Sequence, residues 1–305
     1  MRTAIRQETE SGKGQGKILS SKDKILLLVF YFLFVWGMDS MLRKLSSAGI
    51  SLPGEMGFIL YPLAILLLFI IAFLLVKLIS KRPFASYGVK RFASKDFTLM
   101  LCFVFLLMPL AFLGRVIDPS FDSWYAGSAG LSTFSGFLLF SLVMPLYVIK
   151  EEIIERAVFQ STMRRAYGLF IVFFAISLNF SLAHFFYIPG FGLKHVIVQT
   201  ASVFIGSFFL IMFFELTGNL WLAILLHLVY NVLISLQIYL HVSSLVWESV
   251  FWLMMGGLFL LSLRTGLSRI MPSLRSMRIS KLPVSEWLFL AVFAVVLPVL
   301  LILLR

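Results

Sequence analysis

Three short polar patterns interrupt otherwise apolar segments of the chain. They read EEIIER (151–156), FSLAH (180–184) and HLVYN (227–231). An ionisable side chain is costly inside a bilayer, so several of them at intramembrane positions mark a functional site. Together the patterns supply carboxylates, a guanidinium, two imidazoles and an amide, which is the set of groups that hydrolysis of an amide bond requires.

These groups suit two kinds of chemistry. A buried carboxylate can act as a general base toward water, while a neighbouring imidazole orients that water or protonates the leaving amine. An imidazole and an amide on one helix face can donate hydrogen bonds to the oxyanion of a tetrahedral intermediate. Alternatively, one glutamate and two histidines form the ligand set of a catalytic zinc ion with an open fourth position. The residue types alone favour neither chemistry.

The spacing within each pattern is helical. Side chains four residues apart share one face of a helix and can contact each other. The pairs at this spacing are Glu152 with Arg156, Phe180 with His184, and His227 with Asn231. Because three separate segments carry such pairs, we expect Glu151, Glu152, Arg156, His184, His227 and Asn231 to converge on one intramembrane polar cavity.

The composition places these segments in a membrane. The chain is 60% hydrophobic and only 13% charged, whereas soluble domains have about 25% charged residues. Its formal charge of +12 resides in bases that cluster between apolar runs, so it indicates membrane topology rather than nucleic-acid binding. The single cysteine, Cys102, excludes an intrachain disulfide.

The apolar runs predict an all-α polytopic fold with about eight or nine transmembrane helices. A crossing helix needs about 20 predominantly apolar residues, and backbone polar groups in lipid must be satisfied within the helix. The predicted spans are 25–42, 57–79, 97–115, 134–163, 168–188, 195–216, 219–240, 246–263 and 286–304. We expect residues 264–281 to form a basic loop or a stretch lying along the lipid surface.

The bases also predict an orientation. With a cytoplasmic N-terminus, most of the 26 Lys and Arg residues fall on the inner side, as the positive-inside tendency requires. We therefore expect residues 1–24 to be a cytoplasmic segment and 25–305 to be a single membrane domain. Arg115 then belongs to the few outer bases, and His241 lies at an outer span end.

The three patterns resemble the ordered motifs EExxxR, FxxxH and HxxxN of the CAAX-protease and bacteriocin-processing (CPBP, or Abi) family of intramembrane endopeptidases. The resemblance covers residues 146–235 and includes the stretch TGNLWLAILLHLVYN. It implies a helical membrane fold with a polar catalytic cavity. The chain departs from many members, which have an aromatic residue followed by Arg-Gly where this one has Glu155, Arg156 and Ala157, and this change affects the expected substrate preference.

By matching positions, the resemblance implies a role for each residue. Glu151 would activate water with the support of Glu152 and Arg156. His184 would act on the same water, and His227 with Asn231 would form the oxyanion site. The family has been discussed both as metal-independent and as metalloproteases. The metal alternative implies a zinc ion held by Glu151, His184 and His227.

The function expected is therefore hydrolysis of a peptide bond in a membrane-associated protein or peptide. The expected partners are that substrate and the lipid bilayer, without nucleic acid, and the expected location is a prokaryotic inner or cell membrane. The alternative is a non-hydrolytic membrane protein, an immunity factor or a transporter, that uses the same polar cavity. A transporter would show repeated halves or paired broken helices, and the sequence shows no internal repeat.

Overall fold

The computed structural model describes residues 18–31, 54–91, 93–118, 130–184, 193–276, 282–297 and 299, and these residues contain helices and no strand. The longer helices are α4 (Gly54–Ser80), α5 (Ser94–Ile117), α7 (Phe134–Glu152), α9 (Leu169–His184), α10 (Leu193–Thr217), α11 (Leu220–Ser243) and α12 (Leu245–Ser276). The shorter elements are α2 (Ser21–Phe30), η2 (Phe84–Tyr87), η3 (Ile153–Gln160), α8 (Ser161–Met163), α13 (Val284–Ala291) and η5 (Val292–Val296).

Four of these helices are long and apolar enough to cross a membrane by length and composition. They are Ser94–Ile117, Val196–Thr217, Leu220–Ser243 and Leu245–Arg275. Shorter apolar helices are Ile70–Ser80, Leu169–His184 and Val284–Val296. The chain is an all-α polytopic integral membrane protein, as its apolar runs predicted.

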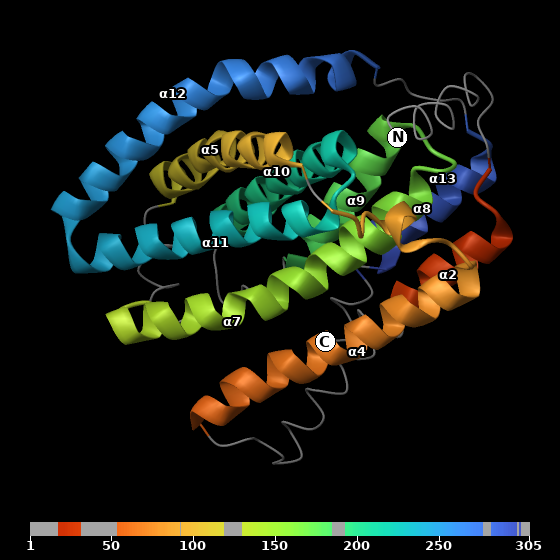
Figure 1. Cartoon of the computed structure of the whole chain (residues 1–305), viewed down its shortest axis with the longest axis horizontal. Coiled ribbons are helices and arrows are strands. Elements are labelled where there is room, and N and C mark those ends of the chain that lie inside the picture. The colour runs from red at the N-terminus through yellow and green to blue at the C-terminus, as the bar shows by residue number, and fades with distance from the viewer. Residues whose placement is uncertain are drawn as a thin grey trace.

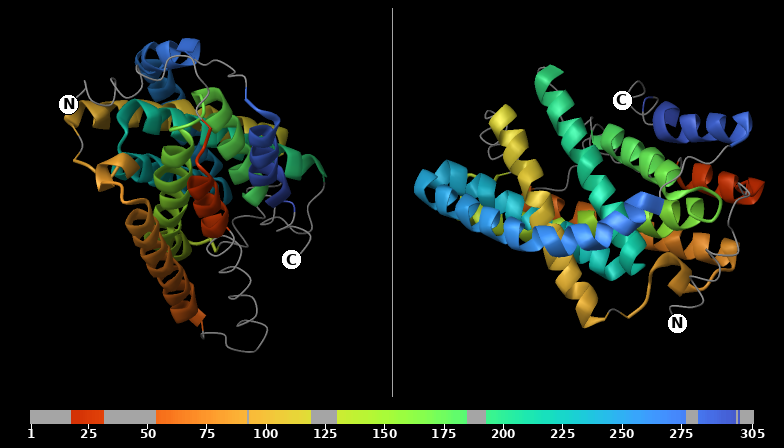
Figure 2. Two further views of the ribbon diagram at one scale, coloured as in Figure 1. Left: turned by 90° about the vertical axis from the view of Figure 1, so that its right-hand side faces the viewer. Right: turned by 90° about the horizontal axis from the view of Figure 1, so that it is seen from above.

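The helices form a bundle around the segment that carries the first motif. Helices α7 and α11 run side by side, α4 flanks α7, and α12 arches over α5 (Figure 1). In the view from above, α10 projects away from the direction shared by α11 and α12 (Figure 2). One buried core cluster contains residues of all three motif-bearing helices, among them Val148 of α7, Val172 of α9 and Leu226 of α11, so these helices share common packing.

Two regions differ from the sequence-based prediction. Residues 264–276, expected in a loop or a surface stretch, continue α12 as a helix to Ser276. The predicted fourth span, 134–163, is helical throughout but changes type, because Ile153–Gln160 is π-helical. Parts of the predicted first, fifth and last spans (32–42, 185–188, 298 and 300–304) lie outside the described residues.

Polar contacts hold the short N-terminal and C-terminal helices to the bundle. Glu286 of α13 is fully buried and pairs with Lys24 of α2 and with the hydroxyl of Tyr167. Asp23 of α2 pairs with Arg82, which lies between α4 and η2. A carboxylate with no exposed surface requires such partners, so these contacts fix both short helices against the segment that follows the first motif.

Candidate active site

The first motif lies where α7 passes into the π-helical segment η3. Pro145 inside α7 lacks an N–H, so it removes one hydrogen bond of the helical ladder shortly before the motif. Glu151 and Glu152 end the α-helical part, and Glu155 and Arg156 lie in η3. Single π-helical turns inside α-helices occur frequently at functional sites, and this one widens the helix at its most polar residues.

The third motif is positioned by a capped turn. Helix α10 ends at Thr217, and Gly218 follows with φ +55°, a left-handed conformation that glycine adopts without strain. The Asn219 side chain then caps α11, because its Oδ1 accepts a hydrogen bond from Leu222 N at 3.2 Å. Its Nδ2 also donates to the Lys90 carbonyl at 3.1 Å, which ties the start of α11 to the loop before α5.

His227 of α11 lies between the two adjacent carboxylates of the first motif. Its Nδ1 is 2.8 Å from Glu152 Oε1, and its Nε2 is 3.9 Å from Glu151 Oε2. The first contact is a hydrogen bond and the second is a looser approach. Both carboxylates thus face one imidazole, from its two opposite nitrogens.

Arg156 completes the surroundings of Glu152. Its Nε donates to Glu152 Oε2 at 3.1 Å, and both side chains have no exposed surface. This is the i, i+4 pair that the sequence predicted. The guanidinium also lies 6.0 Å from the ring centroid of Phe180, within the range of a cation–π contact.

Phe180 joins the second motif to this cluster. Its ring centroid lies 4.3 Å from that of His184 and 6.4 Å from that of His227. The His184 Nδ1 donates to the Phe180 carbonyl at 2.8 Å, which leaves Nε2 of a neutral imidazole as an acceptor. The two histidines are therefore arranged around one phenylalanine ring.

Asn231 is placed next to the cluster without a direct hydrogen bond to it. Its Nδ2 approaches Met144 Sδ of α7 at 3.6 Å, and a thioether sulfur is a weak acceptor. The backbone carbonyl of Asn231 accepts from the Ser235 hydroxyl at 2.8 Å. The amide group of Asn231 therefore has a donor that is held only weakly by the protein.

The two carboxylates differ in access and in bonding. The Glu151 side chain is 21% exposed, whereas that of Glu152 has no exposed surface. Both oxygens of Glu152 are engaged, one by His227 and one by Arg156. Glu151 is thus the carboxylate with exposed surface, and Glu152 is the one that its neighbours enclose.

Glu155, the residue that departs from the family pattern, is also buried, with 5% of its surface exposed. Its Oε2 has no hydrogen-bond partner among the described residues, and neither do the two terminal nitrogens of Arg156. The π-helical segment therefore concentrates buried polar atoms beside Glu151 and Glu152.

The residues expected for a zinc ion do not form a preformed ligand set. Within the described part of the chain, no group of three His, Cys, Asp or Glu side chains is arranged to hold a metal ion. His227 uses Nδ1 toward Glu152 and His184 uses Nδ1 toward a backbone carbonyl, so each ring keeps Nε2 as the nitrogen that could face a ligand. The zinc alternative stays a prediction, and the chemistry considered below is that of the protein's own side chains.

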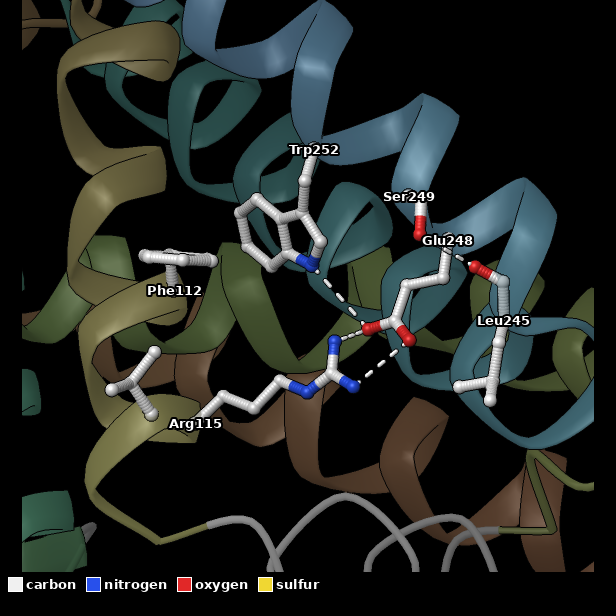
Figure 3. Close-up of a pocket in the computed structure, with 7 residues that line it drawn as sticks. Phe112, Arg115, Leu245, Glu248, Ser249 and Trp252 are labelled. Atoms are coloured by element: carbon white, nitrogen blue, oxygen red, sulfur yellow. Dashed lines mark hydrogen bonds and ion pairs between the residues drawn. The ribbon is translucent and has the colours of Figure 1, made fainter.

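A second polar cluster, which the sequence did not indicate, joins the far ends of α5, α11 and α12. Glu248 is almost fully buried and pairs with Arg115, while Trp252 Nε1 donates to it at 3.3 Å (Figure 3). Gln237 Nε2 donates to the same carboxylate at 3.2 Å, and His241 Nδ1 lies 3.0 Å away. Glu248 is the third residue of the predicted apolar span 246–263, and an acid at that position was the signal from which the cluster could have been predicted.

This second cluster borders a cavity of about 500 Å³. Another cavity, of about 610 Å³, lies at the end of α4. Neither is lined by the motif residues. The structure thus brings Glu151, Glu152, Arg156 and His227 into one cluster, with His184 joined through Phe180 and Asn231 adjacent.

Comparison with known families identifies the part of the chain that contains this cluster. Residues 131–233 match the family model described as Type II CAAX prenyl endopeptidase Rce1-like. The match spans roughly a third of the chain and includes all three motifs. No curated protein and no solved structure matched the chain in the same comparisons. The matched domain supports a CAAX-type intramembrane protease. The match at residues 131–233 supports assignment of this part of the chain to the CAAX-protease and bacteriocin-processing family.

Proposed function

We propose that the chain hydrolyses a peptide bond of a membrane-associated protein or peptide with water activated by Glu151. The observation that carries this proposal is the difference in exposure and hydrogen bonding between the two adjacent carboxylates. Glu151 is 21% exposed and makes no hydrogen bond to the described residues that would occupy it, whereas Glu152 is buried with both oxygens engaged. A general base must be reachable by the water whose proton it takes, and Glu151 meets that condition.

His184 is suited to hold the attacking water. Because its Nδ1 donates to the Phe180 carbonyl, the Nε2 of the neutral ring can accept a hydrogen bond from water. Water held by His184 and Glu151 would attack the scissile carbonyl carbon while its proton passes to Glu151. The protonated Glu151 would then return that proton to the leaving amine.

His227 and Asn231 are suited to stabilise the oxyanion that forms in this attack. They are four residues apart on α11 and share one face. Asn231 can exchange its weak contact with Met144 for a stronger one to the oxyanion. An Nε2–H donor on His227 requires a proton on both ring nitrogens. Glu152 supplies the counter-charge at Nδ1, because Glu151 has by then taken the proton of the water.

Glu152 and Arg156 act in this proposal as positioning residues. Glu152 fixes the His227 ring through Nδ1, and Arg156 fixes Glu152 through Nε. Arg156 in the π-helical segment therefore holds Glu152, and Glu152 holds His227 of α11, which would face the oxyanion. We propose further that residues 25–305 form one membrane domain in a prokaryotic cell membrane. The N-terminal segment, 1–24, would be cytoplasmic, because most bases then lie on the inner side.

The test is cleavage by the full-length protein purified in detergent. The probes are a farnesylated peptide that ends in a CAAX sequence and the same peptide without the lipid. Glu151→Gln keeps the shape of the side chain but cannot accept the proton, so we expect turnover to fall about 100- to 10,000-fold with little change in KM. Glu215→Gln is the matched control, because Glu215 pairs with Arg164 outside the cluster, and we expect it to retain activity.

Size-exclusion profiles and thermal unfolding of both variants separate loss of chemistry from loss of fold. Near wild-type cleavage by a folded Glu151→Gln variant would exclude Glu151 as the base. Cleavage of neither peptide by the wild-type protein would reject the CAAX-like substrate class for this chain.

A further inference from the structure

A basic cavity lies where α4 ends and the chain turns into η2. It has a volume of about 610 Å³ and is lined by Lys77, Leu78, Lys81, Arg82, Pro83 and Phe84. Three of these six residues are cations and none is an acid. The lining therefore presents positive charge next to apolar surface.

Two of the three cations have no carboxylate partner among the described residues. Arg82 is committed, because it pairs with Asp23 and donates to Thr162 Oγ1 at 3.3 Å. Lys77 and Lys81 form no ion pair with a carboxylate of the described residues. The Lys77 ammonium instead lies 4.7 Å from the ring centroid of Phe84, so it is held over the cavity wall by a cation–π contact.

Lys81 occupies a backbone position that a lysine rarely takes. Its φ is +55°, and it is the sole non-glycine residue with positive φ in the described part of the chain. Its N–H closes the end of α4 by donating to the Lys77 carbonyl at 3.0 Å. Glycine or asparagine is usual at such a helix end, since the left-handed region is strained for most L-residues. The lysine here adds a charge to the cavity at a position where the backbone does not favour it.

The helix that leads to the cavity presents apolar side chains outward. Leu74, Leu75, Leu78 and Ile79 are 41–63% exposed, and they belong to the last, strongly apolar part of α4. Exposed apolar side chains on a membrane helix face lipid tails. The cations at the end of this face then lie at the depth of the lipid headgroups, where Lys and Arg concentrate.

We infer that this cavity binds the phosphate of an anionic phospholipid. Lys77 and Lys81 would contact the phosphate, Phe84 and Pro83 would cover the glycerol region, and an acyl chain would follow the exposed face of α4. Arg82 would attract the phosphate through its charge without contacting it, because its side chain already pairs with Asp23. The site lies apart from the motif cluster, to which it is connected by the hydrogen bond from Arg82 to Thr162, just after η3.

Lipid retention by the full-length protein tests the inference. The protein in detergent is titrated with dioleoyl phosphatidylglycerol or dioleoyl phosphatidylcholine, and native mass spectrometry counts the retained lipids. We expect one phosphatidylglycerol to bind in preference to phosphatidylcholine. Lys77→Gln/Lys81→Asn should weaken that binding roughly 30-fold, about 5-fold for each lysine near a membrane surface. Asparagine at position 81 tolerates the left-handed backbone, so the fold should persist.

Lys95→Gln/Arg269→Gln is the matched control. It removes two exposed charges from α5 and α12, outside the cavity lining, and should leave phosphatidylglycerol binding within about 2-fold of wild type, since only unspecific attraction changes. An equal loss in both double variants would show that net charge alone attracts the lipid and would overturn the inference. So would a wild-type protein that binds both lipids equally.

Two further measurements address the nature of the ligand. Phe84→Ala should weaken phosphatidylglycerol binding while keeping its preference over phosphatidylcholine, because it removes apolar cover and no charge. Millimolar inorganic phosphate should compete poorly, since it has no acyl chain to lie on α4. Full displacement by inorganic phosphate would identify a phosphate-ion site and overturn the assignment to a lipid.

Discussion

Replacement of Arg156 by methionine gives the sharpest test of the buried cluster. Arg156 and Glu152 have no exposed surface, and their side chains are 3.1 Å apart. At an effective dielectric constant of 20 the attraction between two charges at that separation is about 5 kcal/mol. Removing one partner of a buried pair leaves the other uncompensated, which typically costs about 3–5 kcal/mol. We therefore expect Arg156→Met to lower the melting temperature in detergent by roughly 6–20 °C.

The Arg164–Glu215 pair supplies the control for this measurement. Arg164 donates to both oxygens of Glu215, at 2.6 and 3.0 Å, and both side chains are 25% exposed. A pair that water can reach contributes about 0–1 kcal/mol. Arg164→Met should therefore shift the melting temperature much less than Arg156→Met, although the geometry of its ion pair is the better of the two.

The double variant Glu152→Gln/Arg156→Met separates charge from packing. It leaves no unpaired charge, and the amide that replaces the Glu152 carboxylate still offers an oxygen to His227 Nδ1. We expect it to recover most of the stability lost in Arg156→Met. If Arg156→Met melts like Arg164→Met, or if the double variant is no more stable than Arg156→Met, the account of a desolvated ion pair is wrong.

Other predictions follow from single contacts. Asn231→Ala should reduce turnover about 100- to 1,000-fold with nearly unchanged binding of substrate to an inactive variant, and weaker binding with normal turnover would assign Asn231 to substrate contact instead. Gly88→Ala should lower the melting temperature, because φ is +81° and an added Cβ would lie 2.6 Å from Phe214, whereas Gly114→Ala, whose Cβ would meet its nearest atom at 3.7 Å, should change it little. Burial, and then the hydrogen bond to Glu286, raises the pKa of Tyr167. The unfolded chain therefore loses this proton first as pH rises above about 10, stability should fall there, and Tyr167→Phe should make the fall measurably shallower.

The sequence predicted the helices well where long apolar runs are bounded by polar residues. The predicted spans 57–79, 97–115, 195–216 and 219–240 correspond to α4, α5, α10 and α11 with small shifts at their ends. The extension of α12 beyond 263 was missed, because this segment lacks the hydropathy of a span and contains Gly266 and Pro272, which disfavour a helix interior. Gly266 in that extension packs against Leu106, a tertiary contact that the sequence does not display.

The candidate site was predictable only where its contacts join residues close in the sequence. The pair of Glu152 with Arg156 is local, and the i, i+4 spacing predicted it. The bond between Glu152 and His227 joins residues 75 apart, so it depends on how α7 and α11 pack. The π-helical form of Ile153–Gln160 leaves no mark in the hydrophobic pattern. His241, expected simply at an outer span end, is bound to buried Glu248, because a lone acid on another helix reaches it.

The 32 residues of α12 make a helix about 48 Å long, whereas the hydrocarbon layer of a bilayer is about 30 Å thick. A continuous helix of this length cannot fit upright within the layer, so it must tilt or extend past one boundary. Its basic residues all lie in its second half. The C-terminal end of α12 is therefore the end that would extend beyond the hydrocarbon layer. Such a helix makes the protein sensitive to hydrophobic mismatch: thinner and thicker membranes would favour different tilts. Because α12 packs on α5 and α11, a change in its tilt with membrane thickness would alter its contacts with the helix that carries His227 and Asn231.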